Sequence, residues 1–335
     1  MEKIGFTTSI PVEVLFAAGI IPVDLNNLFI NNPDNPSMLV EEAEKAGFPR
    51  NTCAWIKGIY SALLDPKNAD IKRIIAVVEG DCSNARALAE VLETKGIRCI
   101  PFSYPPSRDS VALKKEISKL CSIFEVSEDS CLIIKKRLDV IRKRLAYLDM
   151  LTYSQGKVNG FENHLWQVSS SDFNGDHASF GHELESFIIE AERRPVNTYP
   201  VRLGYIGVPP INPAIYGMFE SFGASIVYNE VQRQFTMADS IGIDDISEEY
   251  RRFTYPYFLA ARLPDIKANI DARRIAGIVH YTQSFCFRGI EDIVFRDQID
   301  VPVLTFEGDR PGDLDKRTML RMESFVEMLK DRMLE

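Results

Sequence analysis

The sequence lacks several features that would place it in a broad functional class. It has no run of 18 apolar residues, so it predicts no membrane-spanning helix. It has no dense run of Lys and Arg, and its net charge of −9 argues against a nucleic-acid partner. Glu13 interrupts the N-terminal apolar stretch, and no small-residue cleavage site follows, so a signal peptide is not indicated. We therefore expect a soluble, cytoplasmic protein whose N-terminus forms a strand and a helix.

Paired cysteines are also missing. The 335 residues contain six cysteines but no Cys-x-x-Cys pair, and without a secretory signal they do not indicate a disulfide framework. In a reducing compartment such cysteines are either small buried side chains or ligands. The positions of the cysteines in the predicted fold must therefore show which cysteines are buried packing residues and which are ligands.

Apolar β-branched runs alternate with helical patterns along the chain, which predicts βαβ units and parallel sheets. The pattern predicts an α/β fold with two Rossmann-like, doubly wound parallel-sheet lobes at 1–108 and 196–335, joined by a helical segment at 109–195. Strands are expected at 71–80, 97–102, 201–209, 224–230, 273–283 and 301–308, with a closing helix at 315–333.

The helical segment contains one long amphipathic pattern, from 132 to 151. We interpret its charged face as solvated surface; that face carries Lys135, Lys136, Arg142, Lys143 and Arg144.

Three cysteines occupy the same kind of position. Cys82 and Cys286 directly follow predicted strands and open helices, and Cys53 precedes a helical pattern. The carboxyl ends of parallel strands are where open α/β sheets bind ligands, and a helix N-terminus favours a thiolate. The wide spacing of the three matches no compact metal motif, so the pattern alone leaves a shared site open.

The other cysteines are expected to be ordinary packing residues. Cys99 lies inside a predicted strand, Cys121 lies on the apolar side of a helix, and Cys131 begins the next helix.

Both ends of the chain carry more specific motifs. The opening GFTTSIPVEVLFAAGIIPVDLNN combines Pro-x-Glu with Ala-Gly-x-x-Pro. The closing VPVLTFEGDRPGDLDKRTMLRMESFVEML runs from a strand into Glu-x-Asp and then Arg-x-Glu-x-Phe on a helix. With Cys53-x-x-x-Lys57-Gly58 and the strand into Cys82, these segments resemble the 2-hydroxyacyl-CoA dehydratase and benzoyl-CoA reductase family over essentially the whole chain, most loosely in its middle.

The resemblance implies a cofactor and an activity. In the family a [4Fe–4S] cluster sits between two Rossmann-like lobes, and here Cys53, Cys82 and Cys286 would be its metal ligands. The implied protein is an anaerobic iron–sulfur lyase or oxidoreductase, or a subunit of one. It would use low-potential electron transfer to act on an acyl-CoA-like or other small substrate at the open iron.

The resemblance also implies partners. These are a second subunit, in a homodimer or in a heterodimer with a related chain, and an ATP-dependent iron–sulfur activator protein. The chain has no GxxxxGK[ST] loop, which agrees with ATP being hydrolysed by another protein.

Two departures keep other interpretations open. Ser83 follows Cys82 where the family often has Asp, and the chain is short for the family, which leaves CoA binding open. The alternatives are a non-catalytic iron–sulfur electron carrier or accessory protein, a double-cubane reductase of small molecules, and a metal-free ligand-binding module. A double cubane would require further cysteine ligands, for which Cys99, Cys121 and Cys131 are poorly placed.

Candidate catalytic residues are few. Glu13 is either a base near the site or a helix N-terminal carboxylate, and Tyr281 and Gln283 precede Cys286. Further residues that flank the cysteines are Trp55, Ser83 and Asn84. His177 and His182 are expected in a surface loop. The closing motif also contains charged residues that fit the family pattern: Glu307, Asp309, Arg317 and Arg321. Their alternative role is an ion-pair network that fixes the last helix.

Overall fold

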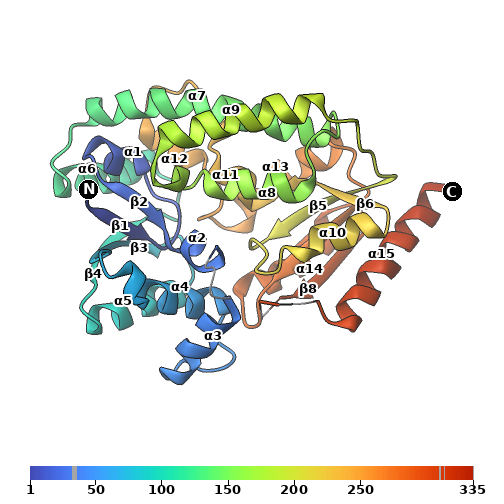
Figure 1. The fold of residues 1–335 in the computed structure, drawn as a ribbon, viewed down its shortest axis with the longest axis horizontal. Helices are drawn as coiled ribbons and strands as arrows, with labels where there is room; N and C mark the ends of the chain where they lie inside the picture. Colours follow the sequence, from blue (N-terminus) through green and yellow to red (C-terminus); the bar gives the residue numbers. More distant parts are fainter. Residues whose placement is uncertain (32–35, 309–310, 313, 335) are drawn as a thin grey trace.

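The computed structural model describes residues 1–31, 36–308, 311–312 and 314–334. Two four-stranded sheets, each parallel throughout, form the two lobes (Figure 1). Their strand orders are β2-β1-β3-β4 and β6-β5-β7-β8, so the two sheets have equivalent topology. The prediction of an α/β fold with two Rossmann-like lobes is confirmed.

The expected strands and helices form close to their predicted bounds. The strands are β1 (Lys3–Phe6), β2 (Ile21–Asp24), β3 (Arg73–Glu79), β4 (Arg98–Ser103), β5 (Val201–Gly207), β6 (Ala224–Asn229), β7 (Gly277–Thr282) and β8 (Val303–Glu307). The helices of the first half are α1 (Val12–Ala17), α2 (Leu25–Ile30), α3 (Pro36–Lys45), α4 (Ala54–Leu64), α5 (Ser83–Thr94), α6 (Ser110–Ile123) and α7 (Glu128–Tyr153). Those of the second half are α8 (Gly160–Ser169), α9 (His177–Arg193), α10 (Ala214–Ser221), α11 (Glu230–Phe235), α12 (Ile246–Arg252), α13 (Leu259–Ala272), α14 (Glu291–Gln298) and α15 (Lys316–Leu334). In the described part of the chain, no helix is both long enough and apolar enough to cross a bilayer.

The first sheet is covered by helices on both faces. Along β3, Ile75 and Val77 belong to the core that the sheet shares with α1, α6 and α7. Ile74 and Ala76 belong instead to the core shared with α4 and α5. Successive side chains of a strand point to opposite faces, so a strand buried on both sides is apolar throughout. The sequence of β3 is a continuous apolar run because the strand is buried on both faces.

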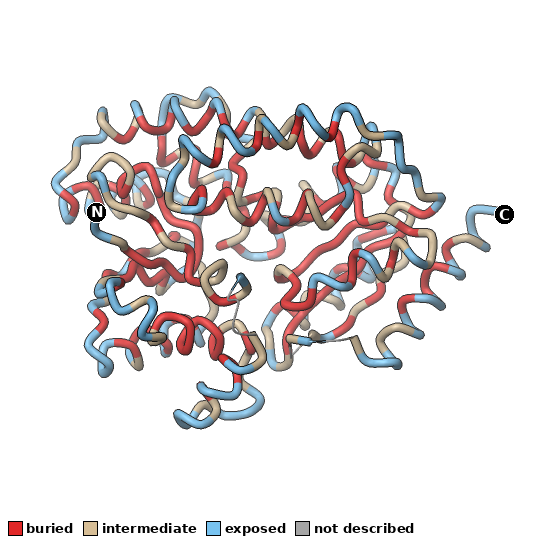
Figure 2. Tube along the Cα trace, in the orientation of Figure 1, coloured by how far each residue is buried: buried red, intermediate tan, exposed pale blue. Residues whose placement is uncertain are grey.

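The second sheet repeats the arrangement. Leu203 and Val279 pack with α10 and α15 on one face, and Ile206 and Ile278 pack with α13 and α14 on the other. Figure 2 shows both sheets buried along most of their length, with exposed residues on the outer turns of the surrounding helices.

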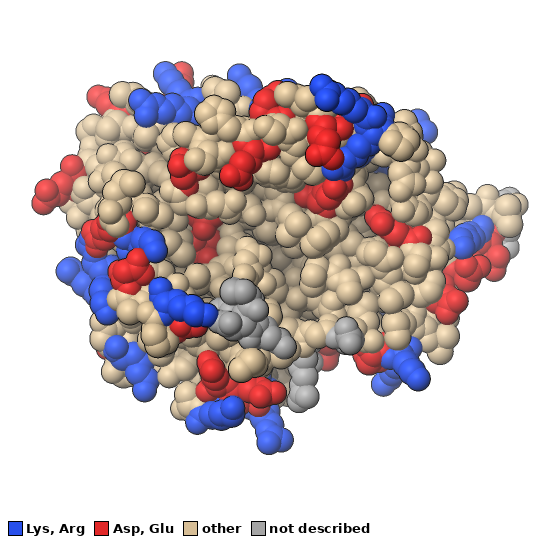
Figure 3. Space-filling view, in the orientation of Figure 1, with Lys and Arg blue, Asp and Glu red and all other residues tan. Residues whose placement is uncertain are grey.

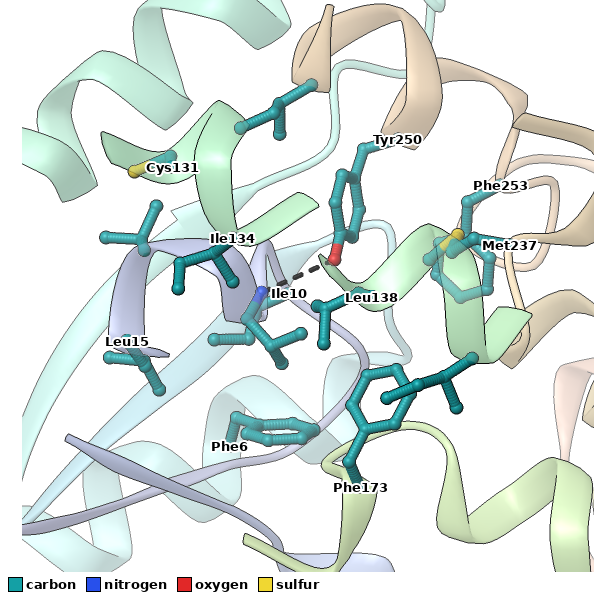
Figure 4. Close-up of a cluster of buried hydrophobic side chains, with 14 of the residues drawn as sticks. Phe6, Ile10, Leu15, Cys131, Ile134, Leu138, Phe173, Met237, Tyr250 and Phe253 are labelled. Carbon is teal, nitrogen blue, oxygen red and sulfur yellow. Dashed lines mark hydrogen bonds between the residues drawn. The ribbon is translucent and has the colours of Figure 1, made fainter. Parts of the chain in front are cut away.

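A helical layer spans both lobes. The long helix α7 and its neighbour α9 run above the two sheets in Figure 1, and α8 lies directly beneath these two helices. One apolar cluster joins this layer to the first sheet and to α12: Figure 4 shows Phe6 and Ile10 near Leu138 of α7, with Tyr250 of α12 beside them. The division of the chain at residues 108 and 195 stays a prediction.

The layer also buries charge, which the sequence did not predict. Lys135 and Arg142 are each only 1% exposed, so the interpretation of these two α7 residues as solvated surface is wrong. Arg142 Nη2 lies 2.7 Å from Glu13 Oε1, and its Nη1 lies 2.7 Å from Glu249 Oε1. Removing one partner of such a buried pair costs about 3–5 kcal/mol. The carboxylates come from α1 and α12, and helical periodicity within α7 could not reveal them.

Close packing between α2 and α4 leads to a testable prediction. A Cβ on Gly58 of α4 would lie 2.3 Å from the Phe29 ring of α2, whereas a Cβ on Gly217 of α10 would meet nothing within 4 Å. We expect Gly58→Ala to lower the free energy of unfolding by about 1–3 kcal/mol through overpacking. The matched control Gly217→Ala should raise it by about 0.5–1 kcal/mol, because alanine favours a helix interior over glycine. Urea denaturation of the two variants measures both; equal effects would contradict this packing.

Candidate functional site

A cleft lies between the lobes, at the carboxyl ends of the strands. In each sheet the strand order reverses between the two central strands, β1 and β3 or β5 and β7. This reversal is where open α/β sheets bind ligands. The loops that follow these four strands line one cleft of about 110 Å³, and they contribute Thr7, Thr8, Ser9, Gly80, Asp81, Cys82, Val208, Pro209, Pro210, Cys286, Phe287 and Arg288. In the orientation of Figure 1, Figure 3 shows mostly uncharged residues over the middle of the molecule, with charged side chains toward its edges.

The three cysteines singled out from the sequence all line this cleft. Cys82 is the N-cap of α5, and Cys53 is the N-cap of α4. Cys286 caps a short 3-10 helix (Phe287–Ile290) that leads into α14. Cys82 and Cys286 follow β3 and β7, which occupy equivalent positions in the two sheets. Because strand ends in different lobes face each other, cysteines far apart in sequence share one space.

Gln283 joins the two lobes beside Cys53. Its Oε1 accepts a hydrogen bond of 3.2 Å from the backbone N–H of Ala54, the first residue of α4, and lies 3.9 Å from Cys53 Sγ. Its amide nitrogen donates to the carbonyl of Gly308 after β8. Cys53 makes no capping hydrogen bond with its own side chain, so a residue from the other lobe serves the start of α4. The candidate Gln283 therefore bridges the two lobes next to Cys53, and it is not itself among the cleft-lining residues.

Cys82 has a distinct electrostatic environment. Burial, and to a smaller extent the neighbouring Asp81 carboxylate, raises the pKa of its thiol to about 12. Burial also raises the pKa of Asp81, whose Oδ1 accepts a hydrogen bond of 2.7 Å from the backbone N–H of Cys82. A thiol in such surroundings is protonated until a metal displaces its proton.

Arg288 supplies positive charge to the cleft, and the sequence analysis missed it. It is 4% exposed, and its guanidinium lies 4.5 Å from the Tyr255 ring centroid. Its Nη2 donates a hydrogen bond of 3.0 Å to the Tyr255 carbonyl, which fixes its direction. Its position two residues after Cys286, at a predicted strand end, was the available signal. Its Nη1 also lies 3.5 Å from Glu291 Oε1, and Asp24 and Asp81 line the same cleft, so the lining carries charges of both signs.

Two hydrogen-bond donors in the cleft lining have no partner among the described residues. They are the buried hydroxyl of Ser9, in the loop after β1, and the buried indole N–H of Trp55 at the start of α4. Buried donors are normally satisfied, so a lining with two open donors suits a bound group that accepts hydrogen bonds.

The thiols of the cleft are donors of the kind that iron–sulfur clusters use. Across the described ranges, no three His, Cys, Asp or Glu side chains are placed to hold one ion. A cubane offers a separate iron atom to each ligand, so its thiolates do not have to meet at one point. Three cysteine thiols and two unpaired donors around one cleft fit an iron–sulfur cluster, whose sulfur atoms accept hydrogen bonds.

The remaining candidates lie elsewhere. Glu13 is in the first turn of α1, bound to Arg142 and to the Tyr250 hydroxyl, and is not among the cleft-lining residues. Tyr281 is buried in β7, and its hydroxyl donates a hydrogen bond of 3.0 Å to the Gly308 carbonyl. Ser83 and Asn84 are exposed at the start of α5.

The two histidines of the helical segment do not lie where the sequence predicted them. His177 and His182 lie in α9 and not in a loop, because Asp176 caps the helix by accepting from the backbone N–H groups of Ala178 and Ser179.

At the closing motif, Arg321 Nη2 donates to the Thr305 carbonyl of β8. No ion pair joins Glu307 to Arg317 or Arg321 in the described structure, and Asp309 lies outside the described residues.

Comparison with known families agrees with this arrangement. Residues 7–329 match the model of the family described as 2-hydroxyglutaryl-CoA dehydratase, D-component. The chain belongs to this family. The resemblance of its two ends to the 2-hydroxyacyl-CoA dehydratases is thereby confirmed. No curated protein matches the chain.

Membership in the dehydratase family sets the general function. The chain is a dehydratase-type component of a 2-hydroxyacyl-CoA dehydratase system. This family depends on iron–sulfur chemistry, and its members belong to multi-subunit systems that include an activator.

A buried histidine at the cleft generates a pH prediction. Burial lowers the pKa of His164 to about 3, and the Gln232 amide nitrogen lies 3.2 Å from its Nδ1. The ring stays neutral in the folded protein, whereas the unfolded chain takes up a proton below a pKa of about 6.5. The unfolded state then binds more protons, so stability falls as the pH drops through 6.5.

We expect this single group to cost roughly 2 kcal/mol of stability between pH 7 and pH 5. His164→Gln should therefore lose less stability than the wild type over that interval, as measured by urea denaturation at both pH values. His182→Gln, at an exposed position of α9, is the matched control and should follow the wild type. An unchanged acid sensitivity of His164→Gln would contradict the assignment.

Proposed function

We propose that the cleft holds one [4Fe–4S] cluster on Cys53, Cys82 and Cys286. The observation that carries the proposal is that these three thiols, from both lobes, line a single cleft at the switch points of the sheets. Family membership supports it, because the family is iron–sulfur dependent. When bound through three cysteines, such a cluster supplies one-electron transfer and one iron without a cysteine ligand, which acts as a Lewis acid.

The chain's own residues would tune and enclose this site. Arg288 would offset the negative charge of thiolate ligands, because its buried guanidinium is fixed by the Tyr255 carbonyl. Gln283 would hold the two lobes in register, since it bonds both Ala54 and Gly308. The unpaired donors of Ser9 and Trp55 would bind acceptor atoms of the occupant. Apolar lining residues such as Ile56 and Val208 would exclude water.

We propose further that the substrate is a 2-hydroxyacyl-CoA or a similar small acyl thioester, dehydrated or reduced at this site. A related subunit or a second copy of the chain, and an ATP-dependent activator, would complete the system. The proposal rests on the family, whose members act in such systems. A double cubane receives no support, because Cys99, Cys121 and Cys131 are not among the cleft-lining residues.

Single substitutions test the ligand set. Anaerobic reconstitution of the purified protein should give about four irons and four sulfides per chain. Cys53→Ser, Cys82→Ser and Cys286→Ser should each lose most of the iron and the visible absorption, because each removes a thiolate ligand. Cys99→Ser is the matched control, since Cys99 lies in β4 away from the cleft, and it should keep both. Full iron content in the three variants, or none in the wild type, would refute the cluster.

A second measurement separates an enzyme from an electron carrier. Addition of 2-hydroxyacyl-CoA thioesters to the reconstituted protein should change the EPR spectrum of the reduced cluster, because substrate would reach the iron without a cysteine ligand. Free CoA and the corresponding acids are the controls. A spectrum unchanged by every thioester, with the cluster intact, would favour the non-catalytic carrier.

A further inference from the structure

The structure brings together two cysteines that lie outside the cleft. Cys121, near the end of α6, and Cys131, in the first turn of α7, have sulfur atoms 3.9 Å apart and in hydrogen-bond contact. The sequence analysis assigned both to ordinary packing. By contrast, the contacts of Cys99 Sγ are with the carbonyl oxygens of Ala89 and Ile97.

The local backbone holds the two sulfurs close to each other. The connection between the helices is short, from Phe124 to Ser127, and the N–H of Val126 bonds back to the Cys121 carbonyl at 3.0 Å. Glu125 adopts a left-handed conformation, with φ 55°, which reverses the chain. A covalent S–S bond is about 2.05 Å long, so a disulfide requires the sulfurs to approach by roughly 2 Å.

A small pocket gives access to the pair. Cys121 is 5% exposed and Cys131 is fully buried, and Figure 4 shows Cys131 at the edge of the apolar cluster near Ile134. Both cysteines line a pocket of about 140 Å³ whose other lining residues are Lys114, Ile117, Glu128, Leu132, Asp244, Asp245, Ile246 and Ser247. The pocket has a polar rim, and Cys121 is the more exposed of the two cysteines that line it.

We propose that Cys121 and Cys131 form a reversible dithiol–disulfide pair that links α6 to α7 when the protein meets a low-molecular-weight disulfide. The proposal does not depend on the proposed function, because neither cysteine lines the cleft. The hydrogen bond from Cys131 lowers the pKa of Cys121, which agrees with Cys121 as the attacking thiol.

The exchange takes two balanced steps. The Cys121 thiolate attacks one sulfur of the reagent RSSR, so a Cys121–S–SR bond forms and RS⁻ leaves. Cys131 then loses its proton and attacks the Cys121 sulfur, which forms the internal disulfide and releases the second RS⁻. The two protons lost by the cysteines convert both RS⁻ to RSH. The protein gives up two electrons, and the reagent is reduced.

Peptide mapping tests the pair directly. The full-length protein is incubated anaerobically with bis(2-hydroxyethyl) disulfide, quenched with acid and an alkylating reagent, and digested with trypsin. Cleavage after Lys119 and Lys135 places both cysteines in the single peptide 120–135. We expect this peptide to lose two hydrogens and to resist alkylation, and dithiothreitol should restore two alkylated cysteines. The peptide 99–108, which contains only Cys99, is the internal control and should carry at most a mixed disulfide.

The order of attack has its own test. Cys131→Ser should trap the reagent on Cys121 as a stable mixed disulfide, whereas Cys121→Ser should leave Cys131 largely unmodified. Alanine at each position serves as a second variant if serine impairs folding. The oxidised wild type should also unfold a few degrees higher than the reduced protein, because a closed loop constrains the unfolded chain, and both variants should lose this shift.

Two outcomes would overturn the proposal. The first is a 120–135 peptide that keeps two alkylated thiols after the reaction has reached its end point. The second is separate mixed disulfides on both cysteines without an internal bond. Either result would show that the two thiols do not act as a dithiol–disulfide pair.

Discussion

Parallel pairing within each sheet is the constraint on which the rest of the structure depends. It sends the carboxyl ends of all four strands to one edge, and the strand-order reversal opens a space there. Two sheets of equivalent topology then face each other across that space, so the loops after β3 and β7 present Cys82 and Cys286 to the same cleft. The bridge from Gln283 to Ala54 and Gly308 ties the lobes together at this point.

Buried charge gives the helical layer its fixed position. Arg142 of α7 pairs with Glu13 of α1 and Glu249 of α12, so one guanidinium connects three helices that are distant in sequence. Burial of charge is costly unless every charge is paired, which makes the arrangement specific to this packing. The ion cluster lies beside the apolar cluster that contains Tyr250 and Leu138, and the Tyr250 hydroxyl also bonds Glu13. Glu13 thereby has a structural role that its place in the Pro-x-Glu motif did not reveal.

The cleft combines features that favour a hydrogen-bond-accepting occupant. Arg288 is a buried cation, and Ser9 and Trp55 keep unpaired donors among the described residues. Arg288 follows β7, Ser9 follows β1 and Trp55 lies in α4, so no single segment contains all three. The three cysteines of the cleft likewise come from separate segments, so this chain has no compact cysteine motif.

The sequence by itself determined the elements whose cause is local. The apolar runs predicted β3, β5 and β7, and the strand ends predicted the N-terminal positions of Cys82 and Cys286. Periodicity and strand chemistry act over a few residues, which is why a sequence pattern reveals them. Only the tertiary structure decided that Lys135 and Arg142 are buried, that Gln283 reaches α4, that Arg288 faces the cleft and that Cys121 meets Cys131. These contacts are set by how the helices and sheets pack, and packing joins groups whose separation along the chain leaves no local signal.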